Sequence, residues 1–544
     1  MVMFMKKIIS VLLCLAMSVC IFSGCSKDES IDLIYPFEGD VKSYDPQVAS
    51  TADEFLIIEN CFEGLVRCDD EGNITPGCAE SWTVSEDGLT YTFKIKQGLK
   101  WYIYPSVKEK MGEDFNPDVT ANDFVYGLQR AVDPNTQCPL FPTVSGIVNA
   151  NEIHSGSADV SSLGVMADGN YTLVINLTTP DDSFLETLST AVAMPCNREF
   201  FESTNGRYGL DLKYTMFNGQ FVITSVLDTS YVLKDNSAYN GPTKAKASDL
   251  TLKKVESDAE LYEDVISGYY DAAYLRGYEG KEVSKKSGIT LIPYSNTTWT
   301  FIMNSSSGIF SQKDARKAFA LSVSEPNYEE YEFLTDAVGY IPPTCTANSK
   351  PYYEQSAAIA ESADQQTAIE LWKDAIDEAD NYSISITVLA PTGMEDVAKE
   401  LLQGVQAGIG SVSKVDDKAV EFSLKLETLT QSEIDSKIAT GEYDVVLYPF
   451  AANSASPVSF LQTFDSSSVT FYRNEFEQAL EDAASASSQD LISACEKCEK
   501  ELYETYSFFP LFYESNYYAQ AKGVSGVQFH PGTGRVNFIN ATRE

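Results

Sequence analysis

Helix-like and strand-like patterns alternate along residues 365–450, and this order limits the possible folds more than any other feature of the chain. The segment predicts, in order, a helix at 369–376, a strand at 384–388, a helix at 397–405, a strand at 420–426, a short helix at 432–438 and a strand at 445–448. Strands that alternate with helices form an α/β layer, because each helix packs back on the sheet that its neighbouring strands build. The sequence therefore predicts an α/β unit here.

The segment that follows the last of these strands is a candidate binding site. In open α/β sheets, ligands bind beyond the carboxyl ends of the strands. Residues 449–457, rich in Ala, Ser and Pro, come directly after the predicted strand at 445–448. An ordinary surface loop has the same composition, so this expectation rests on topology alone.

The rest of the chain predicts a mixed α+β region. Apolar and polar residues alternate at 91–95 and at 173–177, and each run follows an Asp-Gly turn, which indicates strands with one buried face. Residues 508–513 form a dense apolar and aromatic run. We expect this run to be a buried strand, because an exposed apolar patch of that size would promote aggregation.

The first 25 residues have the pattern of an export signal. Lys6 and Lys7 precede an apolar run from Ile8 to Ile21, which is too short to span a bilayer comfortably. The run ends in Phe-Ser-Gly-Cys, which resembles the lipobox of bacterial lipoproteins and implies cleavage before Cys25 and attachment of a diacylglycerol to its thiol. The alternative is a cleaved signal followed by an incidental cysteine. We expect a protein tethered to the outer face of a membrane.

The charge of the chain excludes one class of function. With 39 Lys and Arg against 79 Asp and Glu, the net charge is −40. Nucleic-acid binding requires a basic surface, so no nucleic-acid partner is expected. A hydrophobic content of 44% also excludes a disordered chain.

The sequence lacks the usual motifs of catalysis and metal binding. It contains no Gly-x-Ser-x-Gly elbow, no His-Glu-x-x-His and no phosphate-binding loop, and it has only two histidines. Cys495 and Cys498 share one apolar helix stripe with Leu491 and Leu502, which indicates buried core thiols rather than a metal or redox site. We therefore expect no enzyme activity, no cofactor and no metal.

Several motifs occur in a fixed order between residues 59 and 133. They read ENCFEGLVR at 59–67, ITPGCAESW at 74–82, SEDGLTYTF at 85–93, GLKW at 98–101, VTANDFVY at 119–126 and RAVD at 130–133. Later marks are NGQF at 218–221, GYYD at 268–271 and RKAFA at 316–320. Together they resemble the extracellular solute-binding family that includes the oligopeptide-, dipeptide- and nickel-binding proteins of ABC importers. The resemblance covers essentially all of the chain after the signal.

This resemblance implies a two-lobed, periplasmic-binding-protein-like α/β fold of type II, cluster C, with an inserted small domain and a hinged cleft between the lobes. The implied division is a signal peptide at 1–24, a tether at 25–30, lobe I at 31–61 with 185–290 and 507–544, the inserted domain at 62–184, and lobe II at 295–506. The implied function is capture of oligopeptides, without catalysis, at the extracellular face of the cell membrane. The protein would deliver them, as a monomer, to the transmembrane subunits of an ABC permease.

The resemblance also implies a set of ligand-binding residues. In the oligopeptide branch an aspartate pairs with the peptide amino terminus, and this aspartate falls on Asn453, while a family tryptophan falls on Phe450. Asn brings no charge, so another acid would have to take the role, and Glu514 and Asp465 are possible. The other expected contacts are Tyr448, Ala452, Ser50, Thr51, Ala52, Trp299, Phe512 and Tyr513, each of which could equally be a core or surface residue.

Two alternatives stay open at this point. The same fold could bind another solute, such as an oligosaccharide or a metal chelate, because Asn453 departs from the peptide binders. A function of another class would be a surface hydrolase that uses a pair of carboxylates across a cleft.

Overall fold

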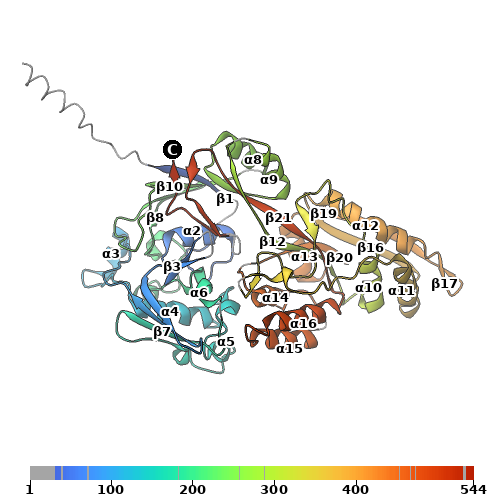
Figure 1. Ribbon diagram of the computed structural model, residues 1–544, viewed down its shortest axis with the longest axis horizontal. Coiled ribbons are helices and arrows are strands. Elements are labelled where there is room, and N and C mark those ends of the chain that lie inside the picture. The colour runs from blue at the N-terminus through green and yellow to red at the C-terminus, as the bar shows by residue number, and fades with distance from the viewer. Residues whose placement is uncertain are drawn as a thin grey trace, which may run out of the picture.

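The computed structural model describes residues 31–544, except 38–40, 70–72, 182, 256–257, 287, 349, 453, 466, 472 and 531–534. The described chain forms two halves, which lie side by side in Figure 1. Each half has its own large hydrophobic cluster. One cluster draws on residues between 33 and 294 and between 518 and 541, whereas the other draws on residues between 299 and 512.

The first half contains two four-stranded sheets. One has the order β1 (Asp32–Phe37), β10 (Asp249–Lys254), β9 (Ser230–Asp235) and β8 (Phe221–Leu227), in which only β1 and β10 are parallel. The other has the antiparallel order β4 (Ala79–Val84), β5 (Thr90–Ile95), β7 (Thr172–Asn176) and β6 (Val165–Ala167). Strands β5 and β7 confirm the strands predicted at 91–95 and 173–177, and the apolar side chains of both face the core.

The second half is built on a seven-stranded mixed sheet. Its order is β11 (Ala272–Leu275), β21 (Phe508–Gln520), β12 (Thr290–Met303), β20 (Val445–Ala451), β16 (Ser383–Pro391) and β19 (Glu421–Leu429), with β13 (Leu334–Asp336) paired to β21. Strand β16 is parallel to both β19 and β20. Helix α11 (Gln365–Glu378) precedes β16 in the chain, α12 (Glu395–Gly410) connects β16 toward β19, and α13 (Gln431–Thr440) connects β19 to β20. The predicted alternation along 365–450 is therefore confirmed, and so is the buried strand at 508–513.

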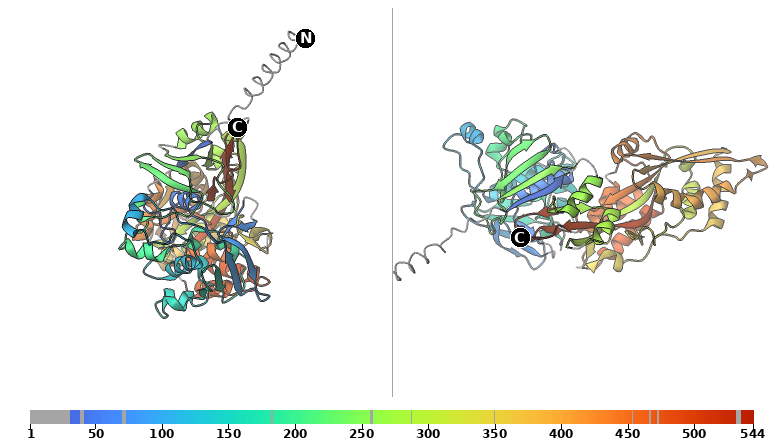
Figure 2. Two further views of the ribbon diagram at one scale, coloured as in Figure 1. Left: turned by 90° about the vertical axis from the view of Figure 1, so that its left-hand side faces the viewer. Right: turned by 90° about the horizontal axis from the view of Figure 1, so that it is seen from above.

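Two long antiparallel strands, β12 and β21, join the halves. Tyr294 of β12 and Tyr518 of β21 belong to the cluster of the first half, whereas Trp299 and Phe512 belong to that of the second. The pairing of these strands shifts register between Tyr294 and Thr297, where the chain passes from one half to the other. The right-hand view in Figure 2 shows this pair of strands running between the halves. A register shift of this kind bends a strand, so the crossover is a natural place for a hinge.

The remaining α-helices and β-strands complete the two halves. Their bounds are α2 (Ala52–Cys61), β2 (Val66–Cys68), β3 (Ile74–Pro76), α3 (Pro105–Met111), α4 (Ala121–Val132), α5 (Ala150–His154), α6 (Phe184–Thr187), α7 (Arg198–Ser203), α8 (Asp258–Ser267), α9 (Gly277–Ser284), α10 (Lys313–Ser322), β14 (Thr346–Ala347), β15 (Lys350–Pro351), β17 (Lys414–Val415), β18 (Lys418–Ala419), α14 (Pro457–Asp465), α15 (Asn474–Ala484), α16 (Leu491–Tyr503), β22 (Val524–Ser525), β23 (Gln528–His530), β24 (Arg535–Asn537) and β25 (Thr542–Arg543).

The cysteines behave as core residues. All eight in the described part of the chain are free thiols, and Cys495 and Cys498 are fully buried on α16, as predicted. Burial raises the pKa of both thiols, which keeps them protonated and unreactive. Among the described residues there is no group of three metal-ligating side chains, and no described helix is long and apolar enough to cross a bilayer.

Candidate functional site

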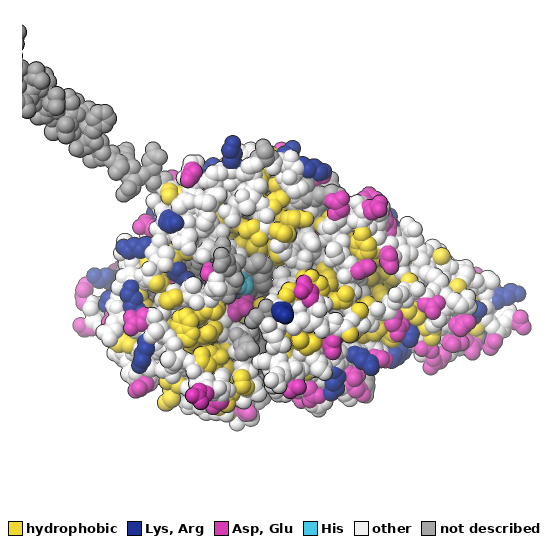
Figure 3. Space-filling view, in the orientation of Figure 1, with side chains coloured by type: hydrophobic (Ala, Val, Ile, Leu, Met, Phe, Trp, Pro, Cys, Tyr) yellow, Lys and Arg dark blue, Asp and Glu magenta, His cyan; other side chains and the backbone are white. Residues whose placement is uncertain are grey.

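A cavity of about 590 Å³ lies between the two halves. The first half contributes residues 142–146, 177–187 and His530 to its wall, and the second half contributes 344–348, 455–462 and 483–491, although not every residue in these ranges lines it. Figure 3 shows a hollow on this face of the molecule where the halves meet. Ligand sites are commonly cavities of this size between domains, so this cavity is the candidate site.

The wall contributed by the first half is the turn that leads into α6. The backbone N–H and the hydroxyl of Ser183 donate hydrogen bonds to Oδ1 of Asp181, at 2.8 and 2.7 Å. This local hydrogen bonding is typical of Asp at the start of a turn. It holds the turn so that Glu186, on α6, lines the cavity.

The wall contributed by the second half is a loop, a hairpin and the start of α14. The backbone N–H of Thr346, on β14, donates to the carbonyl of Ala455 at 2.8 Å. This bond ties the β14–β15 hairpin to the segment that follows β20. Ala455, Ser456 and Pro457, the last residues of the segment predicted from strand order, lie in the wall.

Glu186 and His530 form the most polar part of the site. Nε2 of His530 lies 3.6 Å from Oε1 of Glu186. Burial raises the pKa of Glu186, although Arg535 and the backbone N–H of Ala455 act in the opposite direction. Burial and the nearby Arg535 lower the pKa of His530 to about 4, so this histidine is neutral at pH 7.

The predicted residues Tyr448, Phe450 and Ala452 are not among those that line the cavity. Phe450 is buried, with its ring centroid 4.4 Å from that of Phe464. The hydroxyl of half-buried Tyr448 lies 3.0 Å from Oδ1 of Asp435, to which it donates, and Ala452 is buried. Asn453 lies outside the described residues. Ligand contact by these four residues stays a prediction.

The predicted residues on β12 and β21 lie in the sheet of the second half. The indole N–H of Trp299 donates to Glu514 at 2.8 Å, and Phe512 is fully buried. The hydroxyl of buried Tyr513 lies 3.3 Å from both the N–H and the carbonyl of Gly339. Glu514 is thus occupied by Trp299, and the other candidate acid, Asp465, pairs with Arg473 at 3.1 Å. These contacts are structural, and a ligand role for the three aromatic residues stays a prediction.

The predicted residues at 50–52 form the start of α2. Thr51 caps this helix by accepting a hydrogen bond from the N–H of Glu54 at 3.2 Å, and the Glu54 carboxylate accepts from the N–H of Ser50 at 2.8 Å. Ser50 and Ala52 are exposed, and neither lines the cavity between the halves. A role for these three residues in binding is therefore still only an expectation.

Several residues that line the cavity carry no sequence signal that could have identified them. Glu186 is one of 79 acidic residues, and it lies on a four-residue helix, too short to produce a periodic pattern. Thr344 precedes a two-residue strand, and Gln462 occupies an ordinary position on α14. Only the contact between the halves brings them to one cavity.

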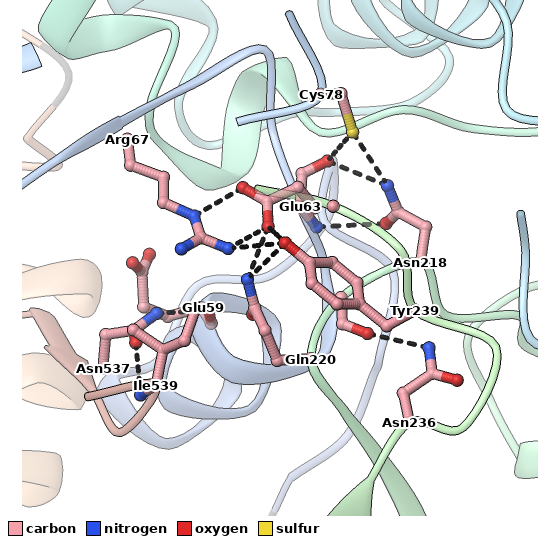
Figure 4. A network of polar contacts seen from close by, with 12 residues as sticks. Glu59, Glu63, Arg67, Cys78, Asn218, Gln220, Asn236, Tyr239, Asn537 and Ile539 are labelled. Atoms are coloured by element: carbon pink, nitrogen blue, oxygen red, sulfur yellow. Dashed lines mark hydrogen bonds and ion pairs between the residues drawn. The ribbon is translucent and has the colours of Figure 1, made fainter. Parts of the chain in front are cut away.

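Residues of the motifs at 59–67, 74–82 and 218–221 meet in a buried network, drawn in Figure 4. The Glu63 carboxylate accepts hydrogen bonds from Nε of Arg67 at 2.6 Å, from the hydroxyl of Tyr239 at 2.7 Å and from the amide of Gln220 at 2.5 Å. Asn218 pairs with the backbone of Glu63 in both directions, at 2.9 and 3.1 Å. These motif residues hold the first half together rather than line the cavity.

Two halves, each with its own core, that are joined by two strands and enclose a cavity define a two-lobed binding protein. The family profile of bacterial extracellular solute-binding proteins, family 5, matches residues 73–472, and the chain belongs to this family. Proteins of this family are the substrate-binding components of transporters and do not catalyse reactions. The family and the type II α/β fold expected from the motifs are thereby confirmed.

Individual relatives extend over nearly the whole chain. A dipeptide-binding protein of Lactococcus lactis is 26% identical over 96% of this chain and 97% of its own length. Among solved structures, Listeria monocytogenes OppA bound to peptide has a TM-score of 0.77 at 20% identity and covers 95% of this chain and 99% of its own. The pheromone receptor PrgZ has a TM-score of 0.76 at 21% identity, with 95% and 100% covered.

Proposed function

We propose that this protein is the substrate-binding component of an ABC importer that captures oligopeptides in the cavity between its halves. The observation that carries the proposal is a cavity of about 590 Å³ whose wall is shared by both halves. Membership of the family and the relatives named dipeptide-binding protein and OppA bound to peptide support peptides as the ligand class. The protein binds its ligand as a monomer and hands it unchanged to the permease.

The division into lobes is part of this proposal. Lobe I consists of residues 31–61, 185–290 and 507–544, the inserted domain of 62–184, and lobe II of 295–506. The separate β4–β7 sheet supports the inserted domain, and the two hydrophobic clusters support the lobes. Strand β21 contributes to both clusters, so the lobes share it.

The proposal includes a lipid anchor at Cys25 on the extracellular face of the cell membrane. The signal at 1–24, Cys25 and the tether up to residue 30 lie outside the described residues, so the anchor is supported by the lipobox-like sequence alone. Membrane fractionation of the native protein and of the Cys25→Ala variant tests it. We expect the native protein in the membrane fraction and the variant released or retained as precursor. A variant that is processed to the mature length and is still as strongly membrane-associated as the native protein would contradict the anchor.

The function is tested on protein purified without denaturation. Native mass spectrometry identifies small molecules that stay bound, and isothermal titration then measures the affinity for peptides of increasing length. We expect co-purified peptides and saturable binding of synthetic peptides without cleavage. A co-purified oligosaccharide or metal chelate with no peptide binding would instead support the non-peptide alternative, and accumulation of cleavage products would contradict a non-catalytic role.

A further inference from the structure

Three buried side-chain oxygens that line the cavity accept no hydrogen bond from the described residues. They are Oε1 of Glu186, Oγ1 of Thr344 and Oε1 of Gln462. Glu186 belongs to the first half, whereas Thr344 and Gln462 belong to the second. Buried polar groups in folded proteins are nearly always hydrogen-bonded. This arrangement therefore indicates that a partner other than the described residues donates hydrogen bonds to these oxygens.

The three oxygens define what such a partner must provide. A carboxylate oxygen and an amide oxygen can only accept hydrogen bonds, and a threonine hydroxyl can do so as well. A molecule that satisfies all three must therefore present N–H or O–H donors toward both walls. Ammonium, guanidinium and amide groups of a peptide meet this requirement.

The charges around the cavity favour a cation. Asp181, Glu186 and His530 are the ionisable residues among the described residues of the wall, and no Lys or Arg is among them. The carboxylate of Asp181 already accepts two hydrogen bonds from Ser183, and His530 is neutral at pH 7. Glu186 is thus the acidic group of the wall that is available to a ligand.

The region behind Glu186 does not neutralise it. A small adjoining cavity is lined by three acids, Glu59, Asp69 and Glu186, and by one base, Arg535. Half-buried Arg535 interacts with both Glu59 and Glu186, so its single charge is shared between them. Arg67 lies near Glu59 but is paired with Glu63. The local balance among the described side chains is therefore negative, which stabilises a bound cation.

We propose that the cleft selects peptides with a positively charged group, either the terminal ammonium or a Lys or Arg side chain, which sits against Glu186 while Thr344 and Gln462 accept N–H bonds from the opposite wall. This inference rests on the proposed function. It assigns the recognition of positive charge to a position on α6, whereas the motif position expected for that role carries the uncharged Asn453.

The test compares peptides that differ only in charge. Isothermal titration is carried out with a neutral, amino-acetylated and amidated peptide that contains one norleucine, with the same peptide containing lysine in its place, and with the norleucine peptide carrying a free amino terminus. For the native protein we expect at least one of the cationic peptides to bind about tenfold or more tightly than the neutral one, because a charge-assisted hydrogen bond is stronger than a neutral one.

Two variants locate the effect. Glu186→Gln keeps the shape of the side chain and removes its charge, and we expect it to reduce the ratio of the affinities for the cationic and the neutral peptide to less than about twofold, whatever the absolute affinities become. Glu152→Gln is the matched control, because it removes one negative charge from an exposed side chain on α5 of the same half. Solvent and salt screen a charge at the surface, so we expect the preference for the cationic peptide to change less than about twofold. The thermal unfolding curve shows that each variant is folded, so a changed affinity ratio reports recognition and not stability.

The outcomes separate this inference from the proposed function. If the native protein binds neutral and cationic peptides equally, or if Glu186→Gln keeps the full preference, the inference is wrong while peptide binding stands. If Glu152→Gln loses the preference as strongly as Glu186→Gln, the general negative field of the protein and not Glu186 selects the ligand, which also overturns it. If no peptide binds to the native protein, both proposals fail.

Discussion

The motif residues that identify the family act as structural supports at the level of single side chains. Asp271, at the end of the GYYD motif, accepts a hydrogen bond from the N–H of Ile34 at 2.7 Å and so links two segments far apart in the sequence. Arg316, from the RKAFA motif, donates to the carbonyls of Phe310 and Thr505 at 2.6 and 3.0 Å. A motif can therefore identify the fold and the family without revealing the ligand.

Glu63 provides the sharpest test of such a support. Its buried carboxylate balances Arg67, so Glu63→Gln leaves a largely buried guanidinium without its partner. We expect the free energy of unfolding to fall by about 3 kcal/mol, measured by urea denaturation. The control is the double variant Glu63→Leu with Arg67→Met, which removes both charges. Its loss of unfolding free energy should be smaller than the sum of the losses measured for Glu63→Leu alone and Arg67→Met alone. A change below about 0.5 kcal/mol in the single variant would contradict the structural role.

Glu499 predicts a pH dependence of stability. Its fully buried carboxyl accepts hydrogen bonds from the N–H groups of Tyr340 and Ile341 and from the hydroxyl of Tyr352, but burial dominates and raises its pKa from 4.5 to about 7. The folded protein therefore holds this proton more tightly than the unfolded chain does. The corresponding stability is fully present below pH 4.5 and is lost as the pH rises toward 7.

The variant Glu499→Gln isolates this contribution from other titrating groups. We expect the melting temperature of the native protein to fall relative to that of the variant between pH 5 and pH 7, and the difference to level off above about pH 7. Thermal unfolding at several pH values measures it. If the melting temperatures of the two proteins change in parallel across this pH range, Glu499 does not titrate there.

At the scale of elements, local sequence determines where helices start, and tertiary contacts determine what they then do. Thr51 and Glu54 form a reciprocal capping box at the start of α2, in which each side chain accepts from the backbone of the other. Residues 50–52, which include Thr51, were expected to contact a ligand because of their place in the family pattern. The capping contact accounts for the residue type of Thr51 without a ligand, whereas Ser50 contributes only its backbone N–H to the box.

Replacement of Thr51 tests the capping role. We expect Thr51→Ala to lower the free energy of unfolding by about 1 kcal/mol, since the N–H of Glu54 loses its acceptor. Thr51→Ser keeps the hydroxyl and should stay close to the native value. Chemical denaturation distinguishes the two variants. If both lose the same stability, the methyl group and not the cap is responsible, and if neither loses any, the cap contributes nothing.

At the scale of the whole molecule, the two halves are joined by β12 and β21. The pairing of these strands shifts register twice, and the shift between Tyr294 and Thr297 lies between the two hydrophobic clusters. Hinged closure of rigid halves around a ligand needs flexible backbone at such a crossover and none within the cores. The cavity wall is shared between the halves, so a ligand contacts both at once. Binding and closure are therefore expected to be coupled.

This coupling predicts a more compact and more stable complex. We expect the radius of gyration from small-angle X-ray scattering to decrease when a peptide that binds the protein is added to the ligand-free form. At a free peptide concentration 100 times the dissociation constant, we expect about 2.7 kcal/mol of added stability. A saturating titration that leaves the radius of gyration unchanged would contradict closure. A rise in stability without compaction would mean that the ligand binds to halves that are already closed.

The sequence alone determined the order of strands and helices along 365–450, the buried strand at 508–513, the core role of Cys495 and Cys498, and the family. Each of these follows from periodicity or motifs within a short stretch of chain, where the physical cause is local burial on one face. It also pointed to the segment after β20, the end of which lines the cavity. Only the tertiary structure decided that Glu186, Thr344 and Gln462 share one cavity. They lie on elements of different halves, and no local pattern records which side chains meet when those halves pack together.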